Sequence, residues 1–272
     1  MGLLILAAIL VAVLSWTLRE ALFRGWRRAR IRARPFPHAW REVLRRRVPY
    51  VRSLPADLQL QLKKHIQVFL AEKPFVGCDG LEITDEMRVT IAAQACLLLL
   101  NRRTDYFPNL TEILVYPGKF IVDRQVADGI GLARRDRSVL SGESWSSGQV
   151  ILSWDDALEG AARSDDAFNV VIHEFAHQLD QENGAANGAP FMRGRSRRQR
   201  WADVLGREYA ALQGRIVDGQ PSLIDAYGAT NPAEFFAVVS EVFFERPCEL
   251  AAEHPGLYAE FSRFYRVNPL SW

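Results

Sequence analysis

Residues 173–177 read His-Glu-Phe-Ala-His, and this short motif constrains the fold more than any other part of the sequence. Two histidines four residues apart lie on the same face of an α-helix, so both imidazoles can reach a single Zn²⁺ ion. The intervening Glu174 lies beside the metal, where it can accept a proton from a bound water and pass it to a leaving amine. The motif therefore predicts a helix that carries His173 and His177 as metal ligands and Glu174 as a general base.

The residues around the motif predict a helix over roughly 166–181 with one buried face. Its apolar residues recur at helical spacing, and their centre lies about 150° from the two histidines, so the imidazoles face a cleft. Asp165 or Asp166 can cap the start, and Gly184 lies shortly past the end. Asp180 lies on the side of the histidines, where it either holds a ring nitrogen of one of them or remains solvated. The apolar stripe comprises Phe168, Val171, Ile172, Phe175, Ala176 and Leu179.

A catalytic zinc ion also needs a third protein ligand and one open position for water. The sixth residue after His177 is Asn183, so the pattern HExxHxxGxxH is absent. A carboxylate from a predicted helix at 231–245 is the natural third ligand, and Glu234 and Glu241 lie seven residues apart on one face of it. Periodicity does not choose between these two glutamates. The alternatives are helix capping for Glu234, and a solvated or ligand-supporting carboxylate for Glu241. The remaining histidines, His38, His65 and His254, have no recognisable ligand spacing.

The chain opens with an apolar run. Residues 3–14 are wholly apolar, and residues 15–18 extend the run to a length of about 27 Å as a helix, just enough for a thin hydrocarbon core. Residues 19–47 hold eleven Arg and two Glu, and the positive-inside rule would keep them in the cytoplasm. We therefore expect residues 1–18 to be a transmembrane anchor and residues 19–35 a basic juxtamembrane linker. A signal peptide and a packed helix are the alternatives.

The basic charge belongs to that one segment. The whole chain has a net charge of +2, whereas residues 19–47 alone are strongly positive, so the rest is net acidic. A nucleic-acid-binding body would carry its basic residues on the folded surface, so we expect no nucleic-acid partner. The three cysteines, Cys78, Cys96 and Cys248, are odd in number and form no CxxC pair, which excludes a disulfide framework and fits a reducing compartment.

Residues 36–272 predict a single α+β domain that is mostly helical with a small mixed sheet. The sequence Arg34-Pro35-Phe36-Pro37 would break any helix that runs on from the N-terminus. Periodicity predicts helices at 55–72, 85–100, 199–213, 231–245 and 255–266, and strands at 112–116, 119–122 and 149–154. The predicted loop at 184–200 is either a solvated surface or a mobile flap over a cleft. It carries Arg193, Arg195, Arg197, Arg198 and Arg200.

Several separated segments, in the right order, resemble the Mlc titration factor A family of bacterial zinc metallopeptidases. They are VIHEFAHQLDQENG (171–184), LIDAYGATNPAEFFAVVSEVFFERP (223–247), TDEMRVTIAAQACLLLL (84–100) and GESWSSGQVILSWDDAL (142–158). The resemblance spans roughly residues 35–272 and implies a zincin-like catalytic domain with aminopeptidase-like activity on short peptides. It also implies binding to a transcriptional repressor of the Mlc type. With the N-terminal run, it predicts a single-pass protein of the bacterial inner membrane with a cytoplasmic catalytic domain; a cytoplasmic protein is the alternative.

The resemblance assigns roles residue by residue. The family's zinc histidines and catalytic glutamate match His173, His177 and Glu174. The family pairs a tyrosine with a glutamate seven residues later, and Tyr227 and Glu234 match that pair. The resemblance thus implies that Glu234 is the third zinc ligand, in a gluzincin-like set. Tyr227 would then donate a hydrogen bond to the oxyanion of the reaction, unless it is simply a core aromatic residue.

Two further expectations follow from the resemblance. The strand at Gln149–Trp154 precedes the zinc helix, as zincin edge strands do, and would pair with the backbone of a peptide substrate. The competing class of function is a regulatory binding protein that sequesters a transcription factor, with a secondary zinc site. An intact Glu174 favours the enzyme, because a structural zinc site needs no general base and normally has four protein ligands.

Overall fold

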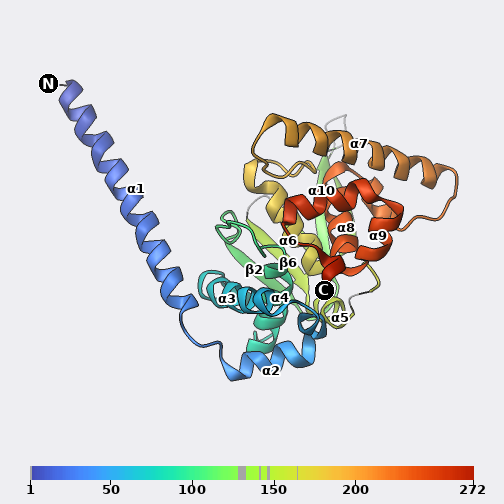
Figure 1. Cartoon of the computed structure of the whole chain (residues 1–272), viewed down its shortest axis with the longest axis horizontal. Helices are drawn as coiled ribbons and strands as arrows, with labels where there is room; N and C mark the ends of the chain where they lie inside the picture. The colour runs from blue at the N-terminus through green and yellow to red at the C-terminus, as the bar shows by residue number, and fades with distance from the viewer. Residues whose placement is uncertain (1, 128–132, 141, 146–147, 164) are drawn as a thin grey trace.

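The computed structural model describes residues 2–127, 133–140, 142–145, 148–163 and 165–272, and Figure 1 shows their arrangement. The described elements are mostly helical. In chain order they are α1 (Gly2–Arg32), α2 (His38–Arg47), η1 (Pro49–Arg52), α3 (Ala56–Glu72), β1 (Phe75–Gly77), α4 (Asp85–Leu97), β2 (Glu112–Tyr116), β3 (Phe120–Ala127), β4 (Ala133–Leu140), β5 (Gly142–Trp145), β6 (Gln149–Ser153), α5 (Trp154–Ala162), α6 (Val170–Asp180), η2 (Gln181–Asn183), α7 (Arg195–Val217), η3 (Ala226–Ala229), α8 (Pro232–Glu245), α9 (Pro247–Glu253), α10 (Pro255–Tyr265) and η4 (Pro269–Ser271).

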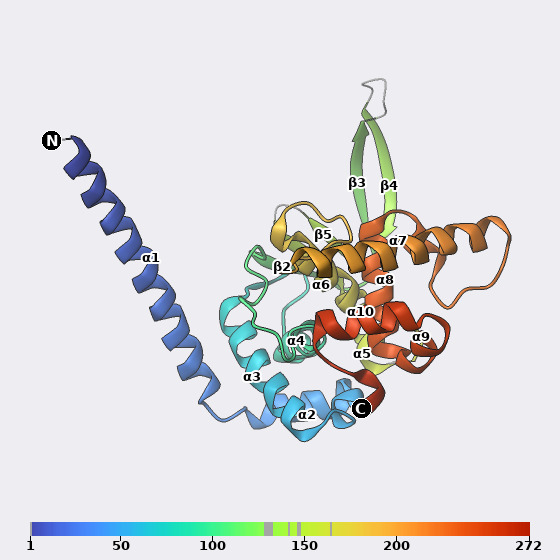
Figure 2. The same cartoon turned by 45° about the horizontal axis from the view of Figure 1, so that its top comes forward.

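The main sheet has the strand order β1-β2-β6-β5. Strands β1, β2 and β6 run parallel, and β5 pairs antiparallel with β6, so β5 forms one edge of the sheet. Strand β6 is buried along most of its length, as expected for a strand with a partner on each side. Strands β3 and β4 form a separate antiparallel ribbon, which stands away from the body in Figure 2.

The core places α6, the helix of the HExxH motif, between the sheet and the C-terminal helices. Helix α6 packs against α8 on one side and against β5 and β6 on the other. The ring of Phe175 lies 4.8 Å from that of Phe107 and 5.7 Å from that of Phe69, measured between centroids. Burying aromatic rings of this size contributes strongly to stability and holds α6 at a fixed depth. The predicted apolar stripe therefore fixes the face that the histidines occupy.

The helix predictions for this core are confirmed, with small shifts at their ends. Helix α4 ends at Leu97 instead of residue 100, and its start is capped by Thr84, whose side-chain oxygen accepts a hydrogen bond from the backbone N–H of Met87. Helix α7 begins at Arg195, so four of the five arginines expected in a loop lie on this helix.

The predicted N-terminal transmembrane helix is wrong, and with it the predicted single-pass placement in the inner membrane. Within the described residues, no helix is long and apolar enough to cross a membrane. The apolar run covers about 27 Å, less than the roughly 30 Å of a typical hydrocarbon core. It also continues without a break, as α1, into the arginine-rich residues up to Arg32. The division at residues 18 and 35 stays a prediction.

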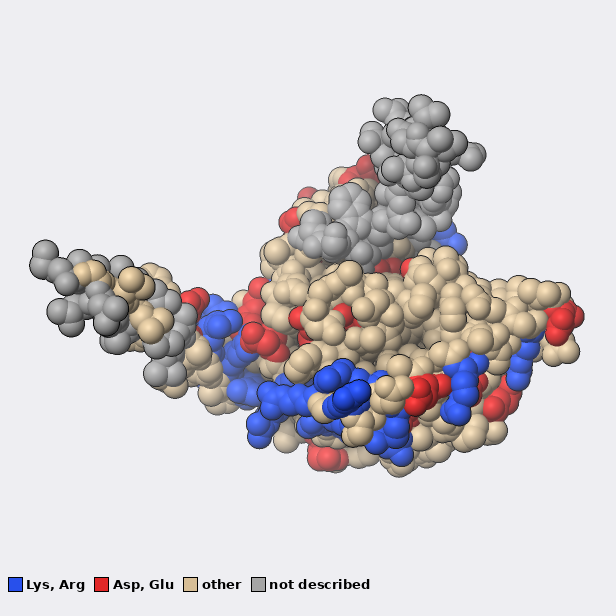
Figure 3. Space-filling view, turned by 90° about the horizontal axis from the view of Figure 1, so that it is seen from above, with Lys and Arg blue, Asp and Glu red and all other residues tan. Residues whose placement is uncertain are grey.

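The arginine-rich half of α1 is bound to the body. Arg28 forms an ion pair with Glu72 at 2.8 Å, and its guanidinium lies 4.9 Å from the ring centroid of Tyr106. The first half of α1 extends away from the body, and its Leu6 and Trp16 are exposed. Basic side chains gather near the point where α1 meets the body, as Figure 3 shows.

Candidate metal centre

The start of α6 is set by a buried asparagine. The side-chain oxygen of Asn169 accepts a hydrogen bond from the backbone N–H of Ile172, which makes Asn169 the N-cap. The predicted caps, Asp165 and Asp166, lie outside the helix, which begins four residues later than expected. Phe168, assigned to the buried stripe, precedes the helix and is 53% exposed.

Three of the predicted site residues bring their side chains to one point. The Nε2 atom of His173 lies 3.0 Å from Oε2 of Glu234 and 3.2 Å from Nε2 of His177. The Nε2 atom of His177 lies 3.3 Å from Oε2 of Glu234. In a tetrahedral zinc site with bonds of about 2.0–2.1 Å, ligand atoms lie about 3.3 Å apart. The three donor atoms therefore have the spacing that one ion of this size requires.

Glu241 acts on the other side of His173. Its Oε1 atom lies 2.7 Å from Nδ1 of His173, while its Oε2 atom accepts a hydrogen bond from the backbone N–H of Asn169 at 2.5 Å. A carboxylate on Nδ1 keeps the proton there and leaves the lone pair of Nε2 free for a metal. Glu241 is therefore buried and bonded to His173, which excludes the solvated carboxylate of the alternative interpretation.

The electrostatics of the three carboxylates differ sharply. Burial would raise the pKa of Glu234, but its hydrogen bonds to His173 and His177 outweigh burial and lower it. Burial raises the pKa of Glu241, against the opposing effect of His173. Burial also raises the pKa of Glu174 to about 7, although both histidines oppose the shift. Burial alone would lower the pKa of His173, but the neighbouring carboxylates of Glu241, Glu234 and Glu174 outweigh burial and raise it.

Glu174 is buried against a glycine of the edge strand. A Cβ atom built on Gly142 would lie 2.7 Å from Oε1 of Glu174 and 2.4 Å from Cγ2 of Val170. Both distances are shorter than real contacts, so any side chain at position 142 must displace its neighbours. Gly142 thus gives the Glu174 carboxylate the room that it occupies beside the three donor atoms. Sequence reasoning had no signal for this contact, because it joins residues 32 positions apart.

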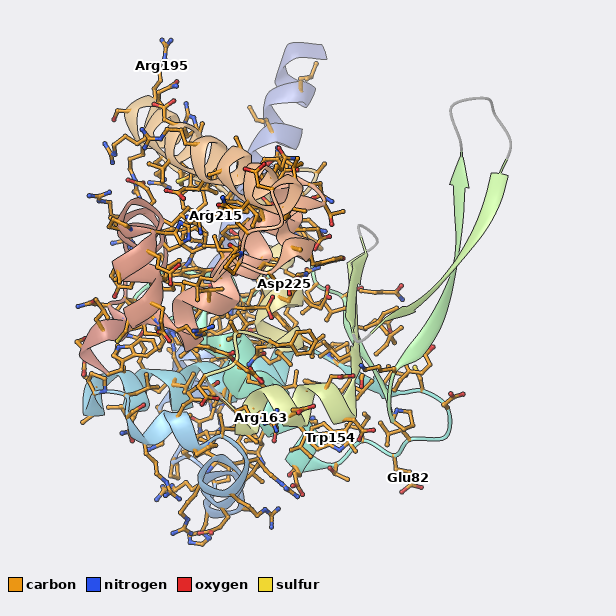
Figure 4. All side chains as sticks on the ribbon, turned by 90° about the vertical axis from the view of Figure 1, so that its right-hand side faces the viewer. Glu82, Trp154, Arg163, Arg195, Arg215 and Asp225 are labelled. Carbon is orange, nitrogen blue, oxygen red and sulfur yellow. The ribbon has the colours of Figure 1, made fainter. Side chains whose placement is uncertain are left out.

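Tyr227 lies next to His173 and is half exposed to solvent. Its ring centroid is 5.9 Å from that of His173, and the residue is 52% exposed. The turn that carries it, η3, is capped by Asp225, which accepts a hydrogen bond from the backbone N–H of Tyr227 at 2.7 Å. Figure 4 labels Asp225. Tyr227 is therefore not the buried core aromatic of the alternative interpretation.

Asp180 has neither of its predicted roles. It is fully buried, and its Oδ2 atom accepts hydrogen bonds from the backbone N–H groups of Asn187 and Gly188, both at 2.7 Å. Gly188 has a φ of +74°, and a Cβ there would lie 2.3 Å from the carbonyl oxygen of Pro232. The end of α6 is thus tied, through this loop, to the start of α8, which carries Glu234.

The predicted substrate-pairing strand is not at the edge of the sheet. Strand β6, which matches the predicted strand at 149–154, is paired on both sides, with β2 and with β5. The strand that lies beside α6 at the edge is β5. An interior strand has no free backbone groups to offer a peptide, whereas an edge strand does.

A helix that supplies two histidines and a glutamate, completed by a carboxylate from a second helix, defines a site of the metallopeptidase type. Comparison with protein families supports the same class of protein. Residues 23–266 match the family described as glucose-regulated metallo-peptidase M90, and the chain belongs to this family.

Its relatives share nearly the full length of the chain. An uncharacterized protein of Synechocystis sp. is 40% identical over 268 residues, which cover 98% of this chain and 97% of the relative. Mlc titration factor A of Enterobacter sp. is 38% identical over 85% of this chain and 86% of its own. Mlc titration factor A of Klebsiella pneumoniae is 38% identical over 85% of this chain and 87% of its own length. The resemblance to the Mlc titration factor A family is confirmed.

Proposed function

We propose that this protein is a zinc-dependent peptidase that hydrolyses short peptides, with an aminopeptidase-like preference. The observation that carries the proposal is the convergence of His173 Nε2, His177 Nε2 and Glu234 Oε2 to within 3.0–3.3 Å of one another beside Glu174. Two nitrogens and a carboxylate oxygen are the donor set that catalytic zinc takes in peptidases. Membership of a metallopeptidase family supports the same chemistry.

The residues of the site would divide the work of peptide hydrolysis. A zinc ion held by the three donors would supply Lewis-acid polarisation of the water and of the substrate carbonyl. The Glu174 carboxylate would accept a proton from the attacking water and hand it to the leaving amine. Burial strengthens the affinity of this carboxylate for a proton, which favours its action as a general base.

Tyr227 and β5 would hold the substrate. Tyr227, half exposed beside His173, would donate a hydrogen bond from its hydroxyl to the oxygen that gains negative charge as the carbonyl is attacked. An extended peptide can add to the free edge of β5 through backbone hydrogen bonds. Because β5 lies against α6, such a peptide would pass close to the three donor atoms.

The test uses the full-length protein purified without chelators. Metal analysis is expected to find about one zinc ion per chain, and a panel of short chromogenic peptides to include hydrolysed members. A strong chelator should abolish turnover and added Zn²⁺ should restore it. Turnover that survives complete removal of metal would contradict the proposal.

A second candidate function comes from the names of the relatives, which describe them as titration factors of Mlc. At 38% identity over most of both chains, this chain could bind a transcriptional repressor of the Mlc type through its surface. Calorimetric titration of such a repressor into the wild type and into His173→Ala separates the two functions. Equal binding by both proteins would make the interaction independent of the metal centre.

A further inference from the structure

A cavity of about 490 Å³ is lined by five arginines. It is formed by the segment after α4, the loop that follows α6, the first turn of α7 and the end of α10. None of the residues assigned to peptide hydrolysis lines it. Its lining residues are Arg102, Arg103, Arg193, Arg197, Arg266, Glu182, Phe191, Met192 and Phe264.

The positive charge of this cavity is not neutralised within the described part of the chain. Neighbouring arginines have acidic partners, as Arg200 and Arg263 do in Glu260. None of the five cavity arginines forms an ion pair with a carboxylate among the described residues. The one carboxyl group in the lining, Glu182, interacts electrostatically with Arg102, and a single carboxylate cannot balance five guanidinium groups.

Arg102 is held rigidly in the wall. Its guanidinium lies 4.2 Å from the ring centroid of Phe264, and its Nη1 atom donates a hydrogen bond to the carbonyl oxygen of Phe264 at 3.2 Å. Burial lowers the pKa of Arg102, which reports the cost of keeping this cation away from water. A guanidinium that is already ordered loses little entropy when it binds an anion.

The start of α7 adds to the positive potential. Arg193 and Arg197 flank this start, where the N-cap residue is Gly194 and offers no side-chain hydrogen bond. The first turn holds no acidic residue, so the partial positive charge of the helix N-terminus lies beside positively charged arginines. Figure 4 shows Arg195, in the same turn, projecting away from the body. An anion bound at this cavity would offset an arrangement that is otherwise unfavourable.

We propose that the arginine-lined cavity binds a small phosphate-bearing ligand with two or more negative charges. A guanidinium group binds two phosphate oxygens through a pair of parallel hydrogen bonds. Five guanidinium groups carry more positive charge than a ligand with one negative charge would balance. A volume of about 490 Å³ is in the range of small-molecule sites. The phosphate belongs either to a soluble metabolite or to a phospholipid headgroup, since both offer the same chemistry.

Calorimetric titration of inorganic pyrophosphate into the full-length protein tests the proposal. Saturable binding is expected, and Arg103→Glu or Arg193→Glu should weaken it by at least about 10-fold, the effect of one lost charge-assisted contact. The matched controls are Arg195→Glu, on an exposed residue, and Arg215→Glu, on a partly buried one; both make the same charge change on α7 outside the cavity lining. These controls should change the affinity by less than about threefold at physiological salt.

A second arm identifies the source of the phosphate. Vesicles of phosphatidylcholine with and without cardiolipin, a lipid whose headgroup carries two phosphates, are sedimented with the same five proteins. Binding only to the cardiolipin vesicles that is lost in Arg103→Glu and Arg193→Glu, without pyrophosphate binding, assigns the site to a lipid headgroup. No binding in either arm, or equal losses in cavity and control variants, overturns the proposal. His173→Ala should bind as the wild type does, so this outcome is independent of the peptidase assignment.

Discussion

At the scale of single residues, the two glutamates of α8 have different roles because their oxygens face different nitrogens of His173. Glu234 Oε2 lies 3.0 Å from Nε2, among the donor atoms, whereas Glu241 Oε1 lies 2.7 Å from Nδ1. Spacing along the sequence placed both carboxylates on one face and could not separate them. Only the approach of α8 to α6, which is a tertiary contact, decides which carboxylate meets which ring atom.

We predict that Glu234→Ala loses zinc affinity far more than Glu241→Ala. Glu234 would contribute a bond to the metal, while Glu241 orients a ligand, and losing such an orienting group typically costs about 10–100-fold in affinity. Equilibrium zinc titration of both variants against a competing chelator measures the difference. If Glu241→Ala is the variant that empties the site, the assignment of the third ligand is wrong.

We also predict that Glu174→Gln keeps the metal and loses nearly all turnover. Glu174 is not one of the three residues whose donor atoms converge, so the metal should stay bound without it. Removal of a general base typically costs about 10²–10⁴ in rate. The isosteric amide preserves the packing against Gly142. Metal analysis and peptide turnover are measured on the same sample. Full activity, or loss of the metal, would count against the general-base role.

At the scale of elements, the position of α6 depends on contacts that the local sequence does not reveal. Its stripe of apolar residues predicted which face is buried, but not where the helix begins. Asp165, Asp166 and Asn169 are all suitable caps by residue type. Asn169 is selected because its backbone N–H donates to Glu241 and its Nδ2 donates to Glu245, both of them on α8. The start of the helix is therefore set from outside it.

The contact between β5 and α6 gives a prediction of its own. Gly142→Ala should reduce turnover strongly while leaving zinc affinity near that of the wild type, because the new methyl group meets Glu174 and Val170 and not the three donor atoms. Overpacking of this kind typically costs about 1–3 kcal/mol of stability. Turnover, zinc titration and denaturant unfolding are compared with Gly214→Ala, a glycine of α7 around which a Cβ meets nothing within 4 Å. Unchanged turnover in Gly142→Ala would show that Glu174 has room to move.

At the scale of the whole molecule, the charge pattern gave one correct prediction and one wrong prediction. The net balance correctly localised the basic segment to residues 19–47, but the inference of a membrane span treated the apolar run as a separate unit. In the structure it is one end of a continuous helix whose other end is bound through Arg28 to Glu72. The arginine-lined cavity was also hidden in the sequence, because the cluster at 184–200 supplies only Arg193 and Arg197 to it, and its other arginines come from distant parts of the chain.

The stability of the whole protein should depend on pH through Glu245. Burial raises its pKa to about 8, so the folded state keeps a proton that the unfolded chain releases near pH 4.5. The free energy of unfolding should therefore fall as the pH rises from about 5 to about 8, by an amount on the order of 2–4 kcal/mol. Glu245→Gln, which stays neutral, should show a shallower slope, because buried groups such as Glu174 still contribute to it. Glu253→Gln, on an exposed glutamate of α9, should keep it. Denaturant unfolding of the three proteins at several pH values measures the slopes, and identical slopes would refute the prediction.

The central claim is that His173, His177 and Glu234 hold one catalytic zinc ion. A crystal of the full-length protein, measured on both sides of the zinc absorption edge, tests it most directly. We expect a single strong anomalous peak about 2.0–2.2 Å from Nε2 of both histidines and from a carboxylate oxygen of Glu234. A peak coordinated by Glu241 in place of Glu234, or no zinc peak at these residues in protein that hydrolyses peptides, would contradict it.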